Sequence, residues 1–342
     1  MKAAIIGGGS WGSAFAVHLG RLKFSTKLWI KEDEIYRDIQ RTGENRVFLP
    51  GIAFPPCVSF FHDLKQAIVD ADIVFIAVPS RFCRHIYKKI VPFLTSEQII
   101  VSLTKGIEED SLKRMSEVME EVFSSSFAPR IAVLSGPSFA REVAESHPTV
   151  VVVASTDIFL AKEIQTFISG HYFRAYSSND IIGVELAGAC KNVIAIATGI
   201  SDSFGFGSNS MAGLVTRGLA EMTRLGIKLG ASLETYAGLA GIGDLVLTCT
   251  GKLSRNRFVG SELGKGKELE KVVSGMKMIA EGISTTLSVH RLSQREKVEM
   301  PICDQVYRII YERKNPREAF QELMSRELKN EFKTIKGVQD EI

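Results

Sequence analysis

The chain has 342 residues, of which 45% are hydrophobic and 24% charged, so it has the composition of a globular protein and is long enough for two domains. Its basic residues are interleaved with acidic ones and leave a net charge of only +3, which argues against nucleic acid or an anionic membrane surface as a partner. The apolar run at the N-terminus is short and breaks into three glycines. We therefore expect neither a secretory signal nor a membrane anchor there, and no stable membrane insertion elsewhere.

The cysteines and histidines carry no metal or disulfide pattern. The five cysteines are scattered and none forms a C-x-x-C pair, which suits free thiols in a reducing cytoplasm. The six histidines are equally dispersed, with no pair four residues apart. We expect a cytoplasmic protein without a metal site.

The first 180 residues alternate short apolar runs with amphipathic stretches. The runs are rich in Val and Ile without polar alternation, which indicates strands covered on both faces and hence a largely parallel sheet. Alternation of strands and helices predicts a doubly wound, Rossmann-type α/β domain over residues 1–180. The expected strands are 2–7, 26–31, 72–80, 99–107, 130–138 and 149–155, and the first helix is 10–22.

Beyond residue 180 strand-like runs disappear and helical periods take over. We expect helices over 181–200, over 209–230 with Asn209 as its N-cap, and over 316–332 with a proline in the first turn. The interpretation is an all-helical domain over 181–332, followed by a polar tail over 333–342.

The loop after the first strand reads GGGSWG and contains Gly7-x-Gly9-x-x-Gly12. Between a strand and a helix, Gly7 allows a tight turn, Gly9 lets the backbone approach a pyrophosphate, and Gly12 lets helix and strand pack closely. Free N–H groups at the helix start then face the phosphates. The loop predicts dinucleotide binding, with Trp11 against the cofactor or a neighbouring loop.

The residues after the second strand bear on the choice of cofactor. A strict NAD enzyme tends to place an acid there for the ribose hydroxyls, whereas this chain places Lys31 first and then Glu32 and Asp33. A cation tolerates a 2′-phosphate, so we predict that NADP is accepted. The alternative is that Lys31 is solvated and Glu32 or Asp33 binds the ribose.

Further polar residues follow predicted strands or form small clusters. Lys105 and the Gly136-Pro137-Ser138 turn come at strand ends, where open α/β sheets bind ligands. Asp244 and Thr248 share a face if their segment is helical. Arg255 suits a phosphate, since a guanidinium gives bidentate contacts. Taken singly, these residues could equally be a solvated lysine, a helix cap and a polar loop.

Lys191 stands in a helix that is otherwise uncharged between Glu185 and Asp202. Its helical neighbours are small (Ala187, Gly188, Ala195 and Thr198), which leaves room for a ligand, whereas a snorkelling lysine would have long apolar neighbours.

Together these segments resemble the bacterial type of NAD(P)-dependent sn-glycerol-3-phosphate dehydrogenase. The matching motifs are GGGSWGSAFA in the first loop, TKGIE at 104–108, LSGPSFAREV at 134–143, ELAGACKNVIAIATGI at 185–200, AGLAGIGDLVLTCT at 237–250, SRNR at 254–257 and AEG at 280–282. The resemblance implies reversible hydride transfer between dihydroxyacetone phosphate and sn-glycerol 3-phosphate with NAD(P)H, feeding phospholipid synthesis. It also implies a helical half like that of 6-phosphogluconate dehydrogenase.

The resemblance further assigns roles to single residues. It implies cofactor contacts for Ser10, Trp11, Lys31, Lys105, Ala140, Arg255, Ile279 and Glu281, and substrate contacts for Lys105, Gly136, Ser138, Lys191, Asp244, Ser254, Arg255 and Asn256. Lys191 becomes the proton-transfer residue. Burial and the like charge of Lys105 are expected to lower its pKa, while Asp244 limits that decrease and Thr248 steadies the geometry.

Other functions remain open on the residues alone. Ketopantoate reductase and 6-phosphogluconate dehydrogenase share the two-domain architecture and a lysine on the helix after the Rossmann half. A non-enzymatic dinucleotide sensor would need the glycine loop but not the lysines with Asp244. The helical half has enough apolar surface for a homodimer, which we expect, although that surface could equally be internal.

Overall fold

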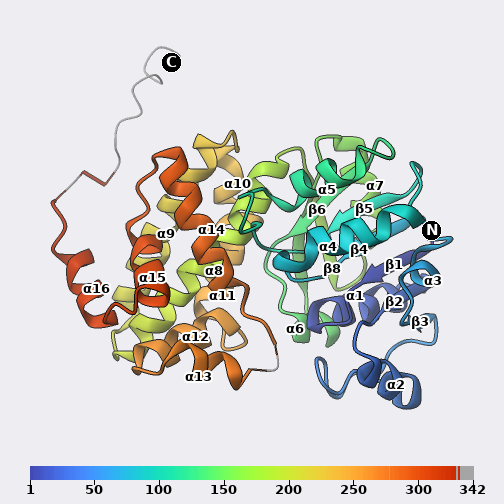
Figure 1. Ribbon diagram of the computed structural model, residues 1–342, viewed down its shortest axis with the longest axis horizontal. Helices are drawn as coiled ribbons and strands as arrows, with labels where there is room; N and C mark the ends of the chain where they lie inside the picture. The colour runs from blue at the N-terminus through green and yellow to red at the C-terminus, as the bar shows by residue number, and fades with distance from the viewer. Residues whose placement is uncertain (277, 329, 332–342) are drawn as a thin grey trace, which may run out of the picture.

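The computed structural model describes residues 1–276, 278–328 and 330–331 and has two side-by-side halves, a sheet half and a helical half (Figure 1). The sheet has eight strands in the order β3-β2-β1-β4-β5-β6-β7-β8. All neighbouring strands are parallel except β6 and β7, so the predicted largely parallel sheet is confirmed. The strands are β1 Ala3–Ile6, β2 Thr26–Trp29, β3 Val58–Phe61, β4 Ile73–Ile76, β5 Ile99–Ser102, β6 Arg130–Ser135, β7 Thr149–Ala154 and β8 Phe173–Ser178.

Helices cover both faces of this sheet, as a doubly wound fold requires. On one face Phe15 of α1 and Phe167 of α7 pack with Phe75 of β4. On the other face Tyr87 of α4 packs edge-on against Phe123 of α5, with ring centroids 5.5 Å apart. The helices of this half are α1 Ser10–Arg21, α2 Asp33–Thr42, α3 Leu64–Ile68, α4 Ser80–Ile90, the 3₁₀ turn η1 Val91–Phe93, α5 Met115–Phe123, α6 Ala140–Ala144 and α7 Ile158–Ile168.

The two outermost strands were not among those predicted from the sequence. β3 lies at one edge of the sheet and β8 at the other, and each has a single neighbour. β8 alternates buried and exposed residues and carries Arg174, so it lacks the continuous apolar run that marks the central strands. Edge strands are covered on fewer sides, which weakens their sequence signal.

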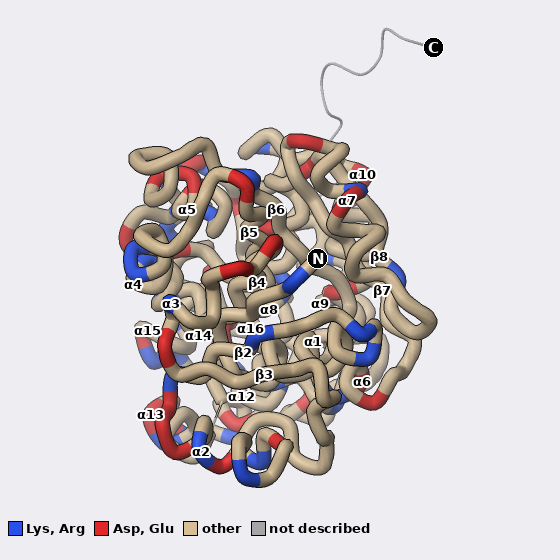
Figure 2. The backbone as a smooth tube through the Cα atoms, turned by 90° about the vertical axis from the view of Figure 1, so that its right-hand side faces the viewer, with Lys and Arg blue, Asp and Glu red and all other residues tan. Residues whose placement is uncertain are grey.

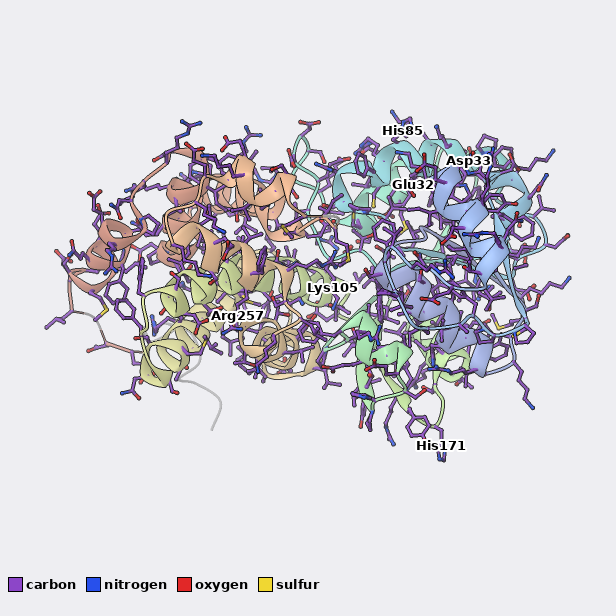
Figure 3. The ribbon with its side chains drawn as sticks, turned by 90° about the horizontal axis from the view of Figure 1, so that it is seen from below. Glu32, Asp33, His85, Lys105, His171 and Arg257 are labelled. Carbon is purple, nitrogen blue, oxygen red and sulfur yellow. The ribbon has the colours of Figure 1, made fainter. Side chains whose placement is uncertain are left out.

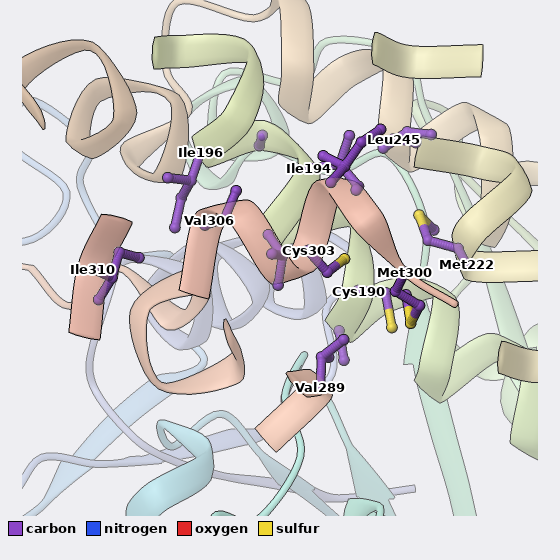
Figure 4. Packing of buried hydrophobic residues seen from close by; sticks show 14 of the residues in the cluster. Cys190, Ile194, Ile196, Met222, Leu245, Val289, Met300, Cys303, Val306 and Ile310 are labelled. Carbon is purple, nitrogen blue, oxygen red and sulfur yellow. The ribbon is translucent and has the colours of Figure 1, made fainter. Parts of the chain in front are cut away.

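The helical half is built around α8, which packs against α9, α11, α12, α14 and α15. Its buried side chains form one core with apolar residues of these helices, several of which Figure 4 shows in close contact. The elements are α8 Ile181–Ser203, α9 Ser208–Lys228, α10 Leu233–Ala237, the π-helical turn η2 Leu239–Gly243, α11 Asp244–Thr250, α12 Arg255–Gly264, α13 Leu269–Ser274, α14 Glu281–Glu296, α15 Pro301–Tyr311 and α16 Pro316–Met324.

Two details of the helix predictions are wrong. Asn209 lies inside α9, whose N-cap is Gly207. The helix that begins at Pro316 ends at Met324 rather than at 332, and the described residues after it are not helical. Met324 and Leu328 are largely or fully exposed, so within the described residues the end of this helix has no apolar surface against which to continue. The tail predicted over 333–342 lies outside the described residues.

The backbone carries Lys and Arg interspersed with Asp and Glu in the view of Figure 2, in line with the mixed charge pattern of the sequence. By length and composition α8 could cross a membrane, but 94% of its most apolar window is buried inside the protein. Burial of this kind is typical of the central helix of a helical domain.

Candidate active site

Two lysines converge on one carboxylate where the sheet half meets the helical half. Lys191 Nζ donates hydrogen bonds of 2.7 Å to Asp244 Oδ1 and to Thr248 Oγ1. Lys105 Nζ donates to Asp244 Oδ2 at 2.7 Å and to the carbonyl oxygen of Gly136 at 2.8 Å. Figure 3 shows Lys105 at the junction of the two halves. The structure therefore brings together the four predicted catalytic residues.

Four separate elements place these side chains. Lys105 follows β5, Gly136 follows β6, Lys191 lies in the middle of α8, and Asp244 is the first residue of α11. Asp244 and Thr248 are one turn apart on α11, as expected, and Thr248 Oγ1 also donates to the Asp244 carbonyl oxygen at 2.7 Å. The carboxylate is thus held by two lysines and does not serve merely as a cap.

Burial and the neighbouring charges together set the pKa values of this cluster. The Lys191 side chain is 6% exposed and that of Asp244 1%. Burial lowers the pKa of Lys191 from its usual 10.5 to about 8; the charge of Asp244 opposes this shift and that of Lys105 adds to it. Burial alone would raise the pKa of Asp244, but the charges of Lys105 and Lys191 outweigh it and hold the pKa below its usual value. The directions expected for Lys191 are confirmed.

The glycine loop fits a pyrophosphate. Gly7 has a φ of +124°, and a Cβ on Gly12 would lie 1.9 Å from the Gly7 carbonyl oxygen, so both positions require glycine. A Cβ on Gly9 would meet nothing within 4 Å, which means that the backbone is open on that side. Gly9 is the N-cap of α1 and provides no side-chain cap, leaving first-turn N–H groups for an anion. The loop has the shape that a dinucleotide needs.

Ser10 and Trp11, between Gly9 and Gly12 of this loop, are only partly buried. Trp11 packs at 5.8 Å from Phe15 with its indole Nε1 buried and, among the described residues, without a hydrogen-bond partner. Ser10 Oγ donates to Met278 Sδ at 2.7 Å, so the segment before α14 crosses the loop. Ala140 begins α6, which packs against α1.

Gly136 and Ser138 form a turn beside Lys105. Gly136 has a φ of +128°, a conformation that favours glycine. Its carbonyl oxygen accepts from Lys105 Nζ and, at 2.8 Å, from Ser138 Oγ. Nearby, a Cβ on Gly188 would approach Ser135 Oγ to 2.6 Å, and this buried hydroxyl has no partner in the described residues. The turn leaves polar groups close to the lysine cluster.

Two residues of the SRNR segment, Ser254 and Asn256, form hydrogen bonds within the helical half, whereas Arg255 is exposed. Ser254 caps α12 by accepting from the Arg257 N–H. Asn256 is buried; its Nδ2 donates to Asn192 Oδ1 at 2.8 Å, and its Oδ1 accepts from the Gly282 N–H at 2.9 Å. Arg255 is exposed, and among the described residues its guanidinium makes one hydrogen bond, of 2.9 Å, to the carbonyl oxygen of Ile279. Its remaining N–H groups can receive an anion.

Glu281 connects the two halves through Ser80, a residue that was not predicted from the sequence. Its carboxylate accepts from Ser80 Oγ at 2.7 Å, and a Cβ on Gly106, the residue after Lys105, would lie 3.0 Å from Glu281 Oε2. Burial raises the pKa of Glu281, which the Ser80 hydrogen bonds counteract. Ser80 follows β4, so the strand-end rule that identified Lys105 could also have identified it. Nothing in the sequence pattern marks Met278.

Lys31 is the one predicted site residue that lies apart from these contacts. It follows β2, is exposed, and places its Nζ 5.6 Å from the ring centroid of Phe82 at the start of α4. Across the described residues there is no group of three or more His, Cys, Asp or Glu side chains that could hold a metal ion.

A glycine loop that fits a dinucleotide in the sheet half, together with a buried lysine of lowered pKa in the helical half, defines a two-domain nicotinamide-dependent dehydrogenase. Two family models match the chain, the N-terminal part of NAD-dependent glycerol-3-phosphate dehydrogenase over residues 2–161 and its C-terminal part over residues 180–321. The chain belongs to this family of oxidoreductases.

Individual relatives agree with the family models. The glycerol-3-phosphate dehydrogenase [NAD(P)+] of Syntrophobacter fumaroxidans is 48% identical over 96% of both chains, and that of a Geobacter species is 49% identical over 96% of this chain and 98% of its own. The crystal structure of glycerol-3-phosphate dehydrogenase from Coxiella burnetii superposes with a TM-score of 0.91 at 40% identity, over 95% of this chain and 99% of the other. A ketopantoate reductase from Ralstonia eutropha shares the fold, with a TM-score of 0.59 at 15% identity over 94% of this chain and all of the other.

Proposed function

We propose that the chain interconverts dihydroxyacetone phosphate and sn-glycerol 3-phosphate with NAD(P)H. The observation that carries the proposal is the pair of lysines on Asp244, which sets a proton donor beside a fixed positive charge in a buried site. Reduction of a ketone places negative charge on the carbonyl oxygen. A proton donor can neutralise that charge, and a fixed positive charge can stabilise it as it develops. When bound, the nicotinamide supplies the hydride.

The chain's own residues divide the work. Lys191 gives its Nζ proton to the carbonyl oxygen in reduction and takes it back in oxidation. Lys105 adds positive charge to the same site, while Asp244 and Thr248 orient the Lys191 ammonium. Gly136, Ser138, Ser254 and Asn256 surround the substrate. We assign cofactor contacts to Gly7, Gly9, Ser10, Trp11, Gly12, Lys31, Lys105, Ala140, Arg255, Ile279 and Glu281.

The deciding experiment is an assay of NADH and NADPH oxidation with dihydroxyacetone phosphate, ketopantoate and dihydroxyacetone as separate substrates. We expect turnover with dihydroxyacetone phosphate far above that with the other two. Faster turnover of ketopantoate would replace the proposal with the reductase alternative. Tight cofactor binding without turnover on any ketone would favour the dinucleotide sensor.

Arg255→Ala is expected to raise KM for dihydroxyacetone phosphate by about tenfold or more, with a smaller effect on kcat, because one charge-assisted contact to the phosphate is lost. Discrimination against unphosphorylated dihydroxyacetone should fall in parallel. Lys252→Ala, which removes an exposed cation from the same loop, is the matched control and should leave KM unchanged. An unaltered KM in the Arg255 variant would show that another group binds the phosphate.

The pH dependence of the two directions should differ in sign. Ketone reduction needs the protonated amine, so its kcat/KM should be level below pH 8 and fall above it, since the pKa of Lys191 is about 8. Alcohol oxidation needs the neutral amine, so its kcat/KM should rise with pH up to the same value. Initial rates in both directions between pH 6 and about pH 10 test this, because the range brackets the Lys191 pKa and ends near the pKa of an ordinary lysine, about 10.4. A reduction profile that is flat to the upper limit would contradict the assignment.

We further propose that residues 1–180 form the cofactor domain and residues 181–332 the substrate domain, and that the protein works in the cytoplasm as a homodimer, supplying glycerol 3-phosphate for phospholipids. No nucleic acid partner and no stable membrane insertion are part of this proposal. The free cysteines support the reducing compartment. Exposed apolar side chains at Val246, Leu253 and Phe258 support a dimer, which sedimentation would test.

A further inference from the structure

A second cation, Arg81, lies near Lys31, over the same aromatic ring. Arg81, in the first turn of α4, has its guanidinium carbon 4.6 Å from the ring centroid of Phe82. Lys31 Nζ lies 5.6 Å from the same centroid. Two cations from segments about fifty residues apart in the chain thus lie over the same aromatic ring, at distances typical of cation–π contacts.

The topology sets this pair beside the glycine loop. Lys31 follows β2 and Arg81 follows β4, and these strands flank β1, whose end opens into the loop. In a doubly wound sheet a dinucleotide lies across the carboxyl ends of such strands, with its adenosine ribose near the end of the second strand. A group on the 2′ position of that ribose would therefore face Lys31 and Arg81.

Neither cation is neutralised by a nearby acid. Both are exposed, and in the described part of the chain neither lies within 4 Å of a carboxylate oxygen. Burial raises the pKa of Glu281, and the charge of Arg81 lowers it, by less than the Ser80 hydrogen bonds and the charge of Arg255 do. Two positive charges that form no ion pair among the described residues repel each other when held together, and a bound dianion would relieve this repulsion.

The neighbouring acids are placed differently. Asp33 is engaged by Arg37 one turn further along α2, at 2.8 Å. Glu32 is the N-cap of α2, forms no side-chain cap bond and is exposed. Figure 3 shows Glu32 and Asp33 in the same part of the sheet half as His85, which lies on α4. Glu32 is therefore the residue that would favour NAD, in opposition to Lys31 and Arg81.

We propose that Arg81 is a cofactor-specificity residue that binds the 2′-phosphate of NADP(H) together with Lys31, and that Phe82 is a positioning residue that holds both cations in place. This proposal rests on the NAD(P) dependence of the proposed function. It assigns the recognition of the phosphorylated cofactor to the β4–α4 junction as well as to the residues after β2.

The test is direct binding to the full-length protein without any ketone, by calorimetric titration with NADPH, NADH, adenosine 2′,5′-bisphosphate and AMP. Arg81→Gln should raise Kd for NADPH and for adenosine 2′,5′-bisphosphate by about tenfold, the effect of one lost charge-assisted contact, and leave Kd for NADH and AMP unchanged. Lys88→Gln removes one exposed charge from the same helix and should change none of the four affinities.

Two variants of Phe82 test whether its ring positions the two cations. Phe82→Leu should lower the ratio of NADPH to NADH affinity, because the cations lose their common ring, and Phe82→Tyr should restore it. A general packing role would instead weaken both cofactors equally and leave the ratio unchanged. The affinity difference in the wild-type protein should also shrink as salt is raised.

Two results would overturn the proposal. One is an Arg81→Gln variant whose affinities for NADPH and NADH are both unchanged or fall equally. The other is a combined result: the wild-type protein shows no preference for 2′-phosphorylated ligands, and the Glu32→Gln variant binds NADH more weakly than the wild type. The titrations contain no ketone. If dihydroxyacetone phosphate proved not to be a substrate, the proposed function would be wrong, but the binding data would still test the role of Arg81.

Discussion

Lys191→Ala is expected to lower kcat for dihydroxyacetone phosphate reduction by about 10³-fold or more, since proton transfer and charge stabilisation at the carbonyl oxygen each contribute factors of this order. The Lys191 amine donates to Asp244 Oδ1 and to Thr248 Oγ1 at 2.7 Å each, and an alanine side chain has no proton to supply in its place. Steady-state kinetics with saturating cofactor measure the effect.

Structural loss must be separated from chemical loss in this variant. Asp244 keeps its bond to Lys105, so its charge stays paired when Lys191 is removed. Lys191→Met fills most of the side-chain volume without the amine and should be as inactive as Lys191→Ala, with NADH binding and melting temperature near those of the wild type. Lys228→Ala, at the end of α9, serves as the surface control. Near-normal kcat in either Lys191 variant would remove this residue from the chemistry.

Asp244→Asn is expected to affect stability and activity together. The carboxylate joins two ammonium groups, and an amide can accept from one lysine only while presenting N–H donors to the other. Breaking such a buried ion pair costs about 3–5 kcal/mol, so the melting temperature should fall by several degrees. Asp38→Asn, which loses an exposed pair with Arg41, should leave it nearly unchanged.

Asp244→Asn is also expected to shift the pH dependence of kcat/KM for ketone reduction. The charge of Asp244 raises the pKa of Lys191 against the lowering effects of burial and Lys105. Without that charge the pKa should fall below 8, and the decline of kcat/KM for reduction should begin at lower pH. Comparison of the two pH profiles isolates the electrostatic role, because a purely structural defect lowers the whole profile without moving it. An unmoved inflection would contradict the coupling of these residues.

The central strands and the long helix α8 could be predicted from the sequence because their signals are local. Continuous apolar runs over 72–80 and 99–107 correspond to β4 and β5, which are buried throughout. The edge strands β3 and β8 could not be predicted in this way, because exposure on one side dilutes their apolar pattern with polar residues. Helix ends depended on partners distant in the chain, as the early end of α16 shows.

The sequence by itself determined the glycine loop, since the permitted backbone conformations and the close approach of Gly12 to Gly7 are properties of glycine. It also supplied a lysine in an uncharged helix and the resemblance that named its companions. Only the tertiary structure decided that Lys105, Lys191 and Asp244 share hydrogen bonds, because these residues come from different elements up to 139 positions apart. The pairing of Lys31 with Arg81 through Phe82 likewise arises from the order of strands in the sheet, which brings the ends of β2 and β4 to either side of β1.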